Sequence, residues 1–103
     1  MGVKYEAVES ERLKKYLARL PVSESGKILS AIAVMAEGDF ALVRTKKLEG
    51  PIRELIVGRH RITYFLLERN LYFVSGFMKK SRKAPKDEIA YARSAYTEQL
   101  HKK

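Results

Sequence analysis

The sequence predicts a small single-domain α+β fold, residues 1–103, in which an antiparallel sheet is packed by helices. Between residues 52 and 78, three short runs rich in β-branched and aromatic residues are separated by turn residues, which is typical of a three-stranded meander. Apolar residues recur at helical spacing in two stretches before these runs and in one stretch after them. A chain of 103 residues can bury a modest core within one domain.

The first expected elements are an edge strand and two helices. Residues 3–8 predict a short N-terminal strand at the edge of the sheet. The helix that follows presents one apolar face, formed by Leu13, Tyr16, Leu17 and Leu20. Pro21 ends this helix, and a second helix is expected over residues 25–36. Two antiparallel helices can then cover the sheet.

The segments that flank the central strands are expected to be a connection and a helix. Residues 40–45 are expected to form a connection in which Ala41, Leu42 and Val43 tuck beneath the sheet. After the sheet, Pro85 is expected at the first helical position, because the acidic residues behind it favour a helix start. This last helix presents one apolar face, formed by Ile89, Ala92, Tyr96 and Leu100.

The three central strands are expected at residues 52–57, 59–68 and 71–78. The turn at residues 49–51 starts the first of them, Gly58 supplies a permissive backbone between the first two, and Asn70 can tolerate positive φ between the last two. This arrangement predicts a three-stranded meander.

The second central strand is expected to present a core face and a cationic face, because side chains alternate along a strand. The core face carries His60, Ile62, Tyr64 and Leu66, and the other face carries Arg59, Arg61, Thr63 and Phe65. Lys79 and Lys80 end the third strand, which runs antiparallel to the second and returns to the Gly58 end. Four cations are therefore expected to meet at that end of the sheet.

The positive charge is concentrated around the predicted sheet. Residues 1–40 contain six Lys or Arg and six Asp or Glu, whereas residues 41–83 contain eleven against three, a net charge of +8 out of +9 for the chain. A one-sided positive field suits a polyanion, and nucleic acid is favoured over a lipid surface. A surface that serves only solubility is the simpler alternative. No apolar run approaches the ~20 residues of a membrane span, so we expect a cytoplasmic protein.

Metal-dependent and serine-type catalysis are not predicted. The chain has no cysteine and two histidines far apart in sequence, so no metal or cofactor is expected. A cationic cluster can instead cleave RNA: a base takes the proton of a 2′-hydroxyl, cations stabilise the phosphate transition state, and an acid protonates the leaving 5′-oxygen. The candidate catalytic residues are Arg61, Lys79, Lys80, Arg59 and His60.

These candidates differ in what they can contribute. Arginine stays charged and pairs phosphate oxygens in a fork, which suits charge stabilisation, whereas a crowded lysine or a histidine can transfer a proton. The candidate RNA or phosphate contacts are Lys46, Lys47, Arg53, Tyr64, Arg82 and Lys83. Structural roles are the alternative for Arg59 and Arg61, which can pair with Glu54 or Glu68, and for His60 and Tyr64 on the core face.

Five short motifs follow one another along the chain. They are Lys47-Leu48-Glu49-Gly50, Glu54-Leu55, Arg61-Ile62-Thr63-Tyr64, Gly76-Phe77-Met78-Lys79-Lys80, and Pro85 with Glu88 and Ala92. With these motifs the chain resembles, over almost its whole length, the HigB/RelE superfamily of bacterial toxins, most closely its phage-related HigB-like branch.

The resemblance implies a RelE-like toxin of a type II toxin-antitoxin system, a metal-independent mRNA endoribonuclease that enters the ribosomal A site and inhibits translation. It implies two partners, the ribosome with its mRNA and a cognate antitoxin that commonly carries a helix-turn-helix domain, and the toxin-antitoxin complex can be dimeric. By position, Arg61, Lys79 and Lys80 match functional residues of the family, and Lys46 or Lys47 matches a phosphate contact.

One departure and two rival functions accompany the resemblance. Ile56 stands where the branch usually has an arginine, and Arg53 or Arg59 can compensate for it. The rivals are a non-catalytic RNA-binding protein that stacks bases on Tyr72 and Phe73, and a ParE-type gyrase poison on the same fold.

Overall fold

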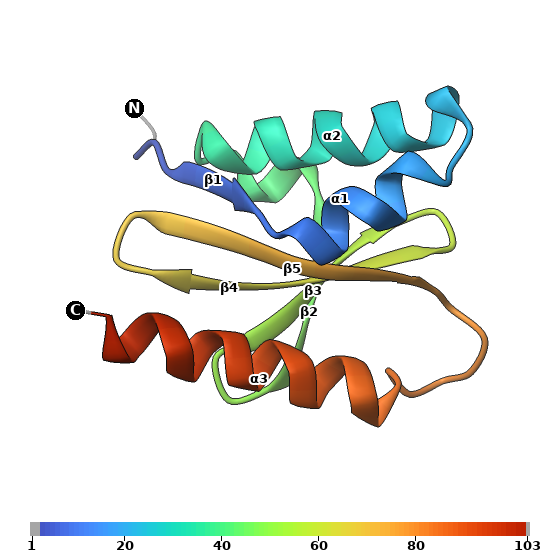
Figure 1. The fold of residues 1–103 in the computed structure, drawn as a ribbon. Coiled ribbons are helices and arrows are strands. Elements are labelled where there is room, and N and C mark those ends of the chain that lie inside the picture. The colour runs from blue at the N-terminus through green and yellow to red at the C-terminus, as the bar shows by residue number, and fades with distance from the viewer. Residues whose placement is uncertain (1–2, 103) are drawn as a thin grey trace.

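Within residues 3–102, which the computed structural model describes, the chain forms three layers (Figure 1). Helices α1 (Glu11–Ala18) and α2 (Val22–Ala36) lie on one face of a five-stranded sheet, and helix α3 (Lys86–His101) lies on the other. The predicted α+β fold is confirmed, with two helices before the central strands and one after them.

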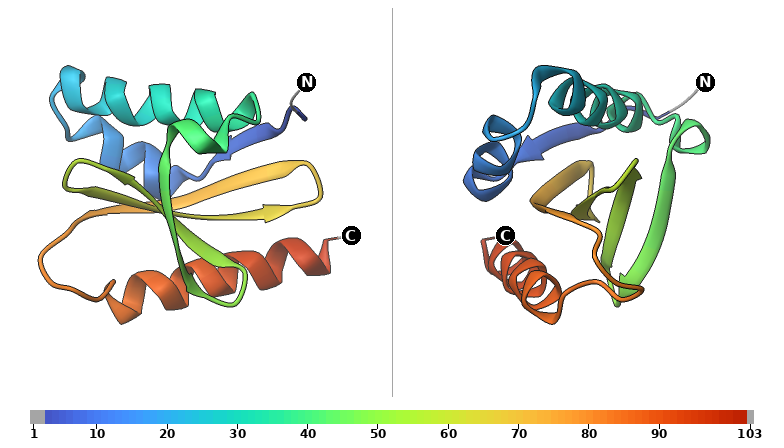
Figure 2. Two further views of the ribbon diagram at one scale, coloured as in Figure 1. Left: turned by 180° about the vertical axis from the view of Figure 1, so that it is seen from behind. Right: turned by 90° about the vertical axis from the view of Figure 1, so that its right-hand side faces the viewer.

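The sheet is mixed and strongly twisted (Figure 2). Its strands are β1 (Glu6–Glu9), β2 (Arg44–Glu49), β3 (Ile52–Val57), β4 (His60–Leu67) and β5 (Asn70–Met78), in the spatial order β1-β5-β4-β3-β2. Strands β2 to β5 form an antiparallel meander, and β1 pairs with β5 in parallel. The predicted central strands and N-terminal edge strand are present, within one to three residues of their expected ends.

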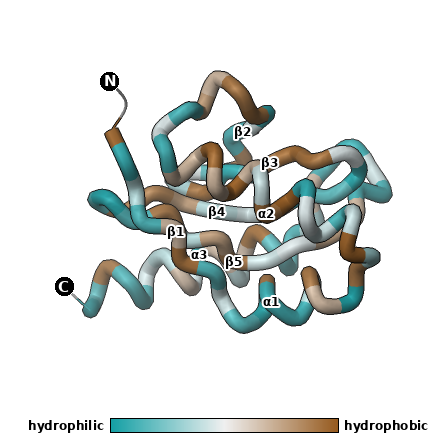
Figure 3. Tube along the Cα trace, turned by 90° about the horizontal axis from the view of Figure 1, so that it is seen from above, coloured by the Kyte–Doolittle hydropathy of each residue, from teal (hydrophilic) through white to brown (hydrophobic). Residues whose placement is uncertain are grey.

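Apolar side chains are buried on both faces of the sheet. The larger cluster lies beneath α1 and α2 and includes Leu13, Ile28, Met35, Ile62 and Phe73. A smaller cluster lies against α3 and consists of Ile52, Phe65, Val74 and Ala92. Hydrophobic and hydrophilic residues alternate along α1 and α3 in Figure 3, as expected of helices with one packed face. The sheet face that carries Arg61 is therefore cationic only at one end, because α3 covers the rest of that face.

Strand β2 corrects the expected connection at residues 40–45. Residues Phe40–Leu42 form a short 3₁₀ helix, and Leu42 is 75% exposed instead of tucked beneath the sheet. The chain then enters β2, whose sequence, Arg-Thr-Lys-Lys-Leu-Glu, has almost no apolar signal. An edge strand can be this polar because it is held by backbone pairing to one neighbour, here β3, and charged side chains protect its open edge.

Several predicted turn and cap positions shift by one to three residues. Ser10 caps α1 by accepting the Leu13 backbone N–H at 3.0 Å. Helix α1 ends at Ala18, three residues before Pro21, and Pro21 is instead the cap of α2, which begins at Val22 and not at residue 25. Pro85 is the cap of α3 and not its first helical residue.

Of the two hairpin turns, one has its positive φ at the expected residue and the other does not. Gly58 adopts a φ of +60° between β3 and β4, as predicted. Between β4 and β5 the positive φ belongs to Glu68, at 58°, whereas Asn70 is the first residue of β5. The Asn70 expectation is therefore wrong, because residues 68 and 69 alone form the turn.

A β-bulge in β5 decides which side chains reach the cationic face. Thr63 on β4 pairs with Ser75, but the next residue, Tyr64, pairs with Phe73, so Val74 has no partner on β4. Ser75 lies on the same face as Thr63, because their hydroxyl oxygens are 2.9 Å apart in a hydrogen bond. After this extra residue, Lys79 lies on the face that carries Arg61, whereas regular alternation would have brought Lys80 there.

Candidate active site

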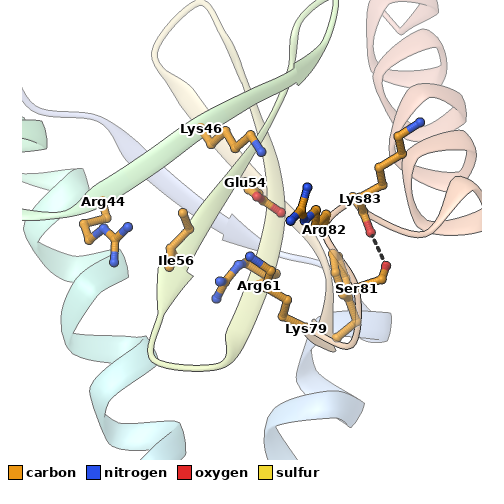
Figure 4. Close-up of a pocket in the computed structure, with 11 residues that line it drawn as sticks. Arg44, Lys46, Glu54, Ile56, Arg61, Lys79, Ser81, Arg82 and Lys83 are labelled. Atoms are coloured by element: carbon orange, nitrogen blue, oxygen red, sulfur yellow. Dashed lines mark hydrogen bonds between the residues drawn. The ribbon is translucent and has the colours of Figure 1, made fainter.

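A basic pocket of about 180 Å³ lies at the Gly58 end of the sheet, beside the loop that joins β5 to α3 (Figure 4). It is lined by Arg44, Lys46, Glu54, Ile56, Arg61, Phe77, Lys79, Ser81, Arg82, Lys83 and Ala84. We call this set the main pocket. Six of the eleven lining residues are Arg or Lys, so the pocket suits an anion.

Strand pairing explains why these residues meet. One row across the sheet joins Arg44, Ile56, Arg61 and Phe77, each paired with the next. The adjacent row joins Lys46, Glu54, Thr63 and Ser75. The loop after β5 then adds the remaining cations, so that residues distant in sequence surround one space (Figure 4).

Arg61 is half-buried, and the backbone holds it in position. Its Nη1 donates to the carbonyl oxygens of Gly58 at 2.8 Å and His60 at 3.1 Å. No described carboxylate forms an ion pair with it. The guanidinium therefore keeps its charge and further N–H donors available to a bound anion.

Glu54 is the one carboxylate among the described lining residues, and only 6% of it is exposed. It lies between Lys46 and Thr63 in the strand register and forms no ion pair with a described residue. A buried carboxylate beside several cations is a candidate for accepting a proton from a bound ligand.

The structure brings together five of the predicted site residues and separates six. Those in the main pocket are Arg61, Lys79, Lys46, Arg82 and Lys83. Those outside it are Lys80, Arg59, His60, Lys47, Arg53 and Tyr64. Lys80 is exposed beyond the end of β5, and Arg59 is exposed in the β3–β4 turn, where its carbonyl accepts the Lys79 N–H at 2.8 Å.

Strand alternation keeps three of the predicted contacts out of the pocket: Arg53, Lys47 and Tyr64. Arg53 Nε donates to the Tyr64 hydroxyl at 3.3 Å, and its Nη2 donates to Thr45 Oγ1 at 3.3 Å. Tyr64 is 5% exposed within the cluster beneath α1 and α2. Lys47 pairs with Arg53 in the strand register and alternates away from Lys46. These residues build the fold on the other face of the sheet.

His60 also points away from the pocket. It is 5% exposed, and each ring nitrogen has a side-chain partner: Nδ1 lies 2.6 Å from the Tyr16 hydroxyl, and Nε2 lies 2.7 Å from Glu24 Oε1. Because a carboxylate only accepts hydrogen bonds, Nε2–H donates to Glu24, and in this tautomer Nδ1 accepts the Tyr16 O–H. Burial, and then the Glu24 charge, raise the pKa of Tyr16 above its ordinary value. We call Tyr16, His60 and Glu24 the histidine cluster.

Sequence reasoning missed Arg44 and Glu54 as site residues. Arg44 pairs directly with Ile56, so it supplies a cation beside the position where an arginine is usual; neither Arg53 nor Arg59, the expected substitutes, lies in the pocket. Arg44 was hidden because β2 was expected to be a connection. Glu54 could have been found from register, because β3 pairs with β4 such that Glu54 and Arg61 share a face.

In the part of the chain that the structure describes, no three His, Asp or Glu side chains are grouped so as to hold a metal ion. None of the described helices is both long and apolar enough to span a bilayer.

Solved structures with a similar fold include a RelE-RelB complex and a toxin-antitoxin complex. The archaeal RelE-RelB complex from Pyrococcus horikoshii OT3 contains a chain that matches with a TM-score of 0.66 and 15% identity, over 74% of this chain and 96% of that chain. A chain of the toxin-antitoxin complex RelBE2 from Mycobacterium tuberculosis matches with a TM-score of 0.54 and 20% identity, over 77% of this chain and 95% of that chain. At these identities the likeness establishes the RelE-like fold. A comparison with curated protein sequences gives no match.

The family comparison covers most of the chain. Residues 15–97 match the model of the family described as phage derived protein Gp49-like (DUF891). This range includes β2 to β5 and every residue of the main pocket. The chain therefore belongs to the Gp49-like family of phage-derived proteins, and it has the RelE-like fold.

Proposed function

We propose that this protein is the toxin of a toxin-antitoxin system and cleaves mRNA on the ribosome without a metal ion. The observation that carries this proposal is the main pocket, in which cations from two strands, β2 and β4, and from the loop after β5 surround one buried carboxylate. The family, the RelE-like fold and the ordered motifs support the toxin assignment, and the resemblance to the HigB-like branch supports the ribosome as the place of cleavage.

The proposed reaction uses only side chains of the main pocket. Glu54 takes the proton of the 2′-hydroxyl, and the O2′–P bond forms as the P–O5′ bond breaks. Lys79 protonates the leaving 5′-oxygen, so that the products are a 2′,3′-cyclic phosphate and a free 5′-hydroxyl. Arg61 stabilises the additional charge on the phosphoryl oxygens through donors that the Gly58 and His60 carbonyls do not use.

The remaining cations have a positioning role in this proposal. Lys46, Arg82 and Lys83 contact phosphates on either side of the scissile one, and Arg44, which pairs with Ile56, supplies the charge that an arginine at position 56 would carry. Such contacts hold the 2′-oxygen in line with the breaking bond, which is a large part of catalysis when the chemistry needs no cofactor.

The structure weakens the reading as a non-catalytic RNA-binding protein. Phe73 is fully buried in the core, and Tyr72 packs against the Phe65 ring with centroids 5.0 Å apart, so these two aromatic residues do not form an open stacking surface. A surface that only binds RNA also gains nothing from Glu54, because its charge repels phosphate. A catalytic pocket has a use for that carboxylate.

Primer extension on a reporter mRNA tests the proposal directly. The reaction is reconstituted translation, with wild type, Arg61→Ala and Arg69→Ala, and with ribosomes present or omitted. We expect new 5′ ends that require ribosomes and that fall by about 10²- to 10³-fold in Arg61→Ala, because one donor to the developing oxyanion is lost. Arg69→Ala removes the same charge from an exposed turn and should cleave like wild type. Intact mRNA with inhibited gyrase supercoiling would instead assign the ParE-type activity.

The proton acceptor is tested by the pH dependence of single-turnover cleavage. If Glu54 is the base, Glu54→Gln loses both the cleavage rate and the acid limb of the wild-type pH profile. A Glu54→Gln enzyme that is slow but keeps the same acid limb would assign the proton transfer to another group.

The proposed partner is a cognate antitoxin. The two similar structures are a RelE-RelB complex and the toxin-antitoxin complex RelBE2, and the HigB-like resemblance implies an antitoxin with a helix-turn-helix domain. We extend both to this chain.

A further inference from the structure

A second cationic groove lies on the other side of β5 from the main pocket. Its volume is about 270 Å³, and it is lined by Arg12, Lys15, Tyr16, Arg19, Gly76 and Glu88. We call it the α1 groove. It was not visible as a charge cluster in the sequence, because residues 1–40 carry equal numbers of acidic and basic side chains.

Helical spacing places the three cations of the groove on one side of α1. Arg12, Lys15 and Arg19 are separated by three and four residues, so they project from neighbouring turns. All three are exposed. The acidic residues of the same segment lie elsewhere: Glu11 pairs with Lys14, and Glu24 binds His60. The groove therefore carries more positive charge than the composition of the segment indicates.

One cation of the groove is held by the protein, and two are available. Arg12 pairs with Glu88 at 3.4 Å and lies over the Tyr91 ring at 4.2 Å from its centroid, which ties α1 to α3 and neutralises Glu88. Lys15 and Arg19 form no ion pair with any described carboxylate. Two unpaired cations beside a neutralised one leave the groove with a net charge of about +2.

The α1 groove and the main pocket adjoin each other across a single strand. Gly76 lines the groove and Phe77 lines the pocket, and consecutive residues of β5 face opposite sides of the sheet. Strand β1 pairs only with residues 70–73 of β5, so α1 and not a strand borders β5 beyond Phe73. Lys79 lines the main pocket, and Lys80 is exposed next to it, just beyond the end of β5. A polyanion bound in the main pocket can therefore extend toward the α1 groove around the end of β5, where these two cations stand.

The close approach of α1 to β5 depends on Gly76. A Cβ atom at this position would lie 2.4 Å from the Tyr16 ring, so any other residue would push α1 away from the strand. The Tyr16 ring forms a fixed wall of the groove, since its hydroxyl is bound to His60. The groove is consequently a shaped feature of the fold and not only a row of mobile lysines.

We propose that the α1 groove binds the phosphate backbone of single-stranded RNA a few nucleotides away from the cleavage site. This inference rests on the proposed function for the identity of the polyanion, and it adds a second binding site that the main pocket does not supply. Cationic grooves that follow a nucleic-acid backbone are the general means by which proteins hold single strands without reading their sequence. The RNA is either the same mRNA strand or ribosomal RNA next to it.

The test is a salt series of binding affinities in an Arg61→Ala background, in which RNA stays intact. The double variant Lys15→Gln/Arg19→Gln is compared with its parent on a 12-nucleotide RNA, on a 3-nucleotide RNA that fills only the main pocket, and on ribosomes. Glutamine keeps helix propensity, so α1 should persist. Lys4→Gln/Lys102→Gln removes the same charge far from the groove and serves as the matched control.

We expect the double variant to bind the 12-nucleotide RNA about tenfold more weakly at ~0.15 M salt, with a log–log salt slope smaller by about 1.4, as two lost phosphate contacts to a single strand imply. The 3-nucleotide RNA and the control variant should show no change. A loss seen only on ribosomes would support the groove with ribosomal RNA as its ligand. Equal affinity and slope on both the long RNA and ribosomes would overturn the inference. Cleavage plays no part in these measurements, so that result would leave the proposed function standing.

Discussion

Two adjacent residues of β4, His60 and Arg61, point to opposite faces of the sheet and differ in how completely the protein satisfies them. Both nitrogens of His60 are bound by side chains of α1 and α2, and the residue is buried. Arg61 is bound only through Nη1, to backbone carbonyls, and lines an open pocket. Polar groups whose hydrogen bonds are complete stabilise a fold, whereas a charge with free donors remains available to a ligand.

The comparison separates two roles that composition alone does not distinguish. The histidine cluster joins α1, α2 and β4 through two hydrogen bonds and so holds the turn at residues 58–59. This turn supplies the Gly58 carbonyl, which accepts a hydrogen bond from Arg61, and the Arg59 carbonyl, which accepts the Lys79 backbone N–H. The histidine cluster therefore supports the main pocket from behind without contacting a ligand.

The largest difference should appear between Lys79→Met and Lys80→Met. Lys79 lines the main pocket beside Arg61, and Lys80 does not. We expect Lys79→Met to lower the single-turnover cleavage rate by about 10²-fold, within the range that a general acid contributes, and Lys80→Met to lower it by only a few-fold. The two variants remove the same charge from adjacent residues, so each controls for the other. A larger loss in Lys80→Met would mean that the bulge does not set the catalytic face.

The sequence predicted the sheet best where apolar residues alternate with turn residues. Strand β3 has the expected bounds, and Gly58 has the expected positive φ. The prediction from the sequence failed at β2, because an edge strand is held by backbone pairing and its polar side chains carry no burial signal. Because β2 was not predicted as a strand, Arg44 was not recognised as a site residue.

The residues of the main pocket were also predicted only in part, because some of their positions depend on contacts between residues that are distant in sequence. The antiparallel return of β5 correctly placed basic residues beside Arg61, but the bulge at Val74, which selects Lys79 over Lys80, depends on tertiary pairing and leaves no local pattern. His60 was expected both as a core residue and as a catalytic candidate. The structure puts it in the core, because its partners Tyr16 and Glu24 are 44 and 36 residues away in sequence.

A His60→Leu substitution should affect stability more than chemistry. It removes both hydrogen bonds and leaves the Tyr16 hydroxyl without its partner, so we expect the free energy of unfolding to fall by about 2 kcal/mol. For a domain of this size the melting temperature would drop by about 10 °C. Cleavage per folded molecule should stay within a few-fold of wild type below the transition. The exposed His101→Leu is the matched control and should be neutral. A fully folded His60→Leu protein with a 10²-fold slower reaction would place His60 in the catalytic machinery.

Tyr16→Phe should have the smallest effect, and its pH dependence identifies the cause. The substitution keeps the ring against Gly76 and removes only the hydroxyl, so we expect a loss of about 1 kcal/mol at neutral pH. Because the pKa of Tyr16 is raised in the folded state, its contribution is complete below about pH 10, the value of an unfolded tyrosine, and is lost as pH rises through the folded value. Urea unfolding from pH 7 to 11 should therefore show the wild-type advantage shrinking only above about pH 10. A wild-type advantage that stayed constant to pH 11 would mean that ionisation of the Tyr16 hydroxyl is not linked to folding. The histidine cluster would then no longer be the stabilising counterpart of Arg61 on the opposite face of β4.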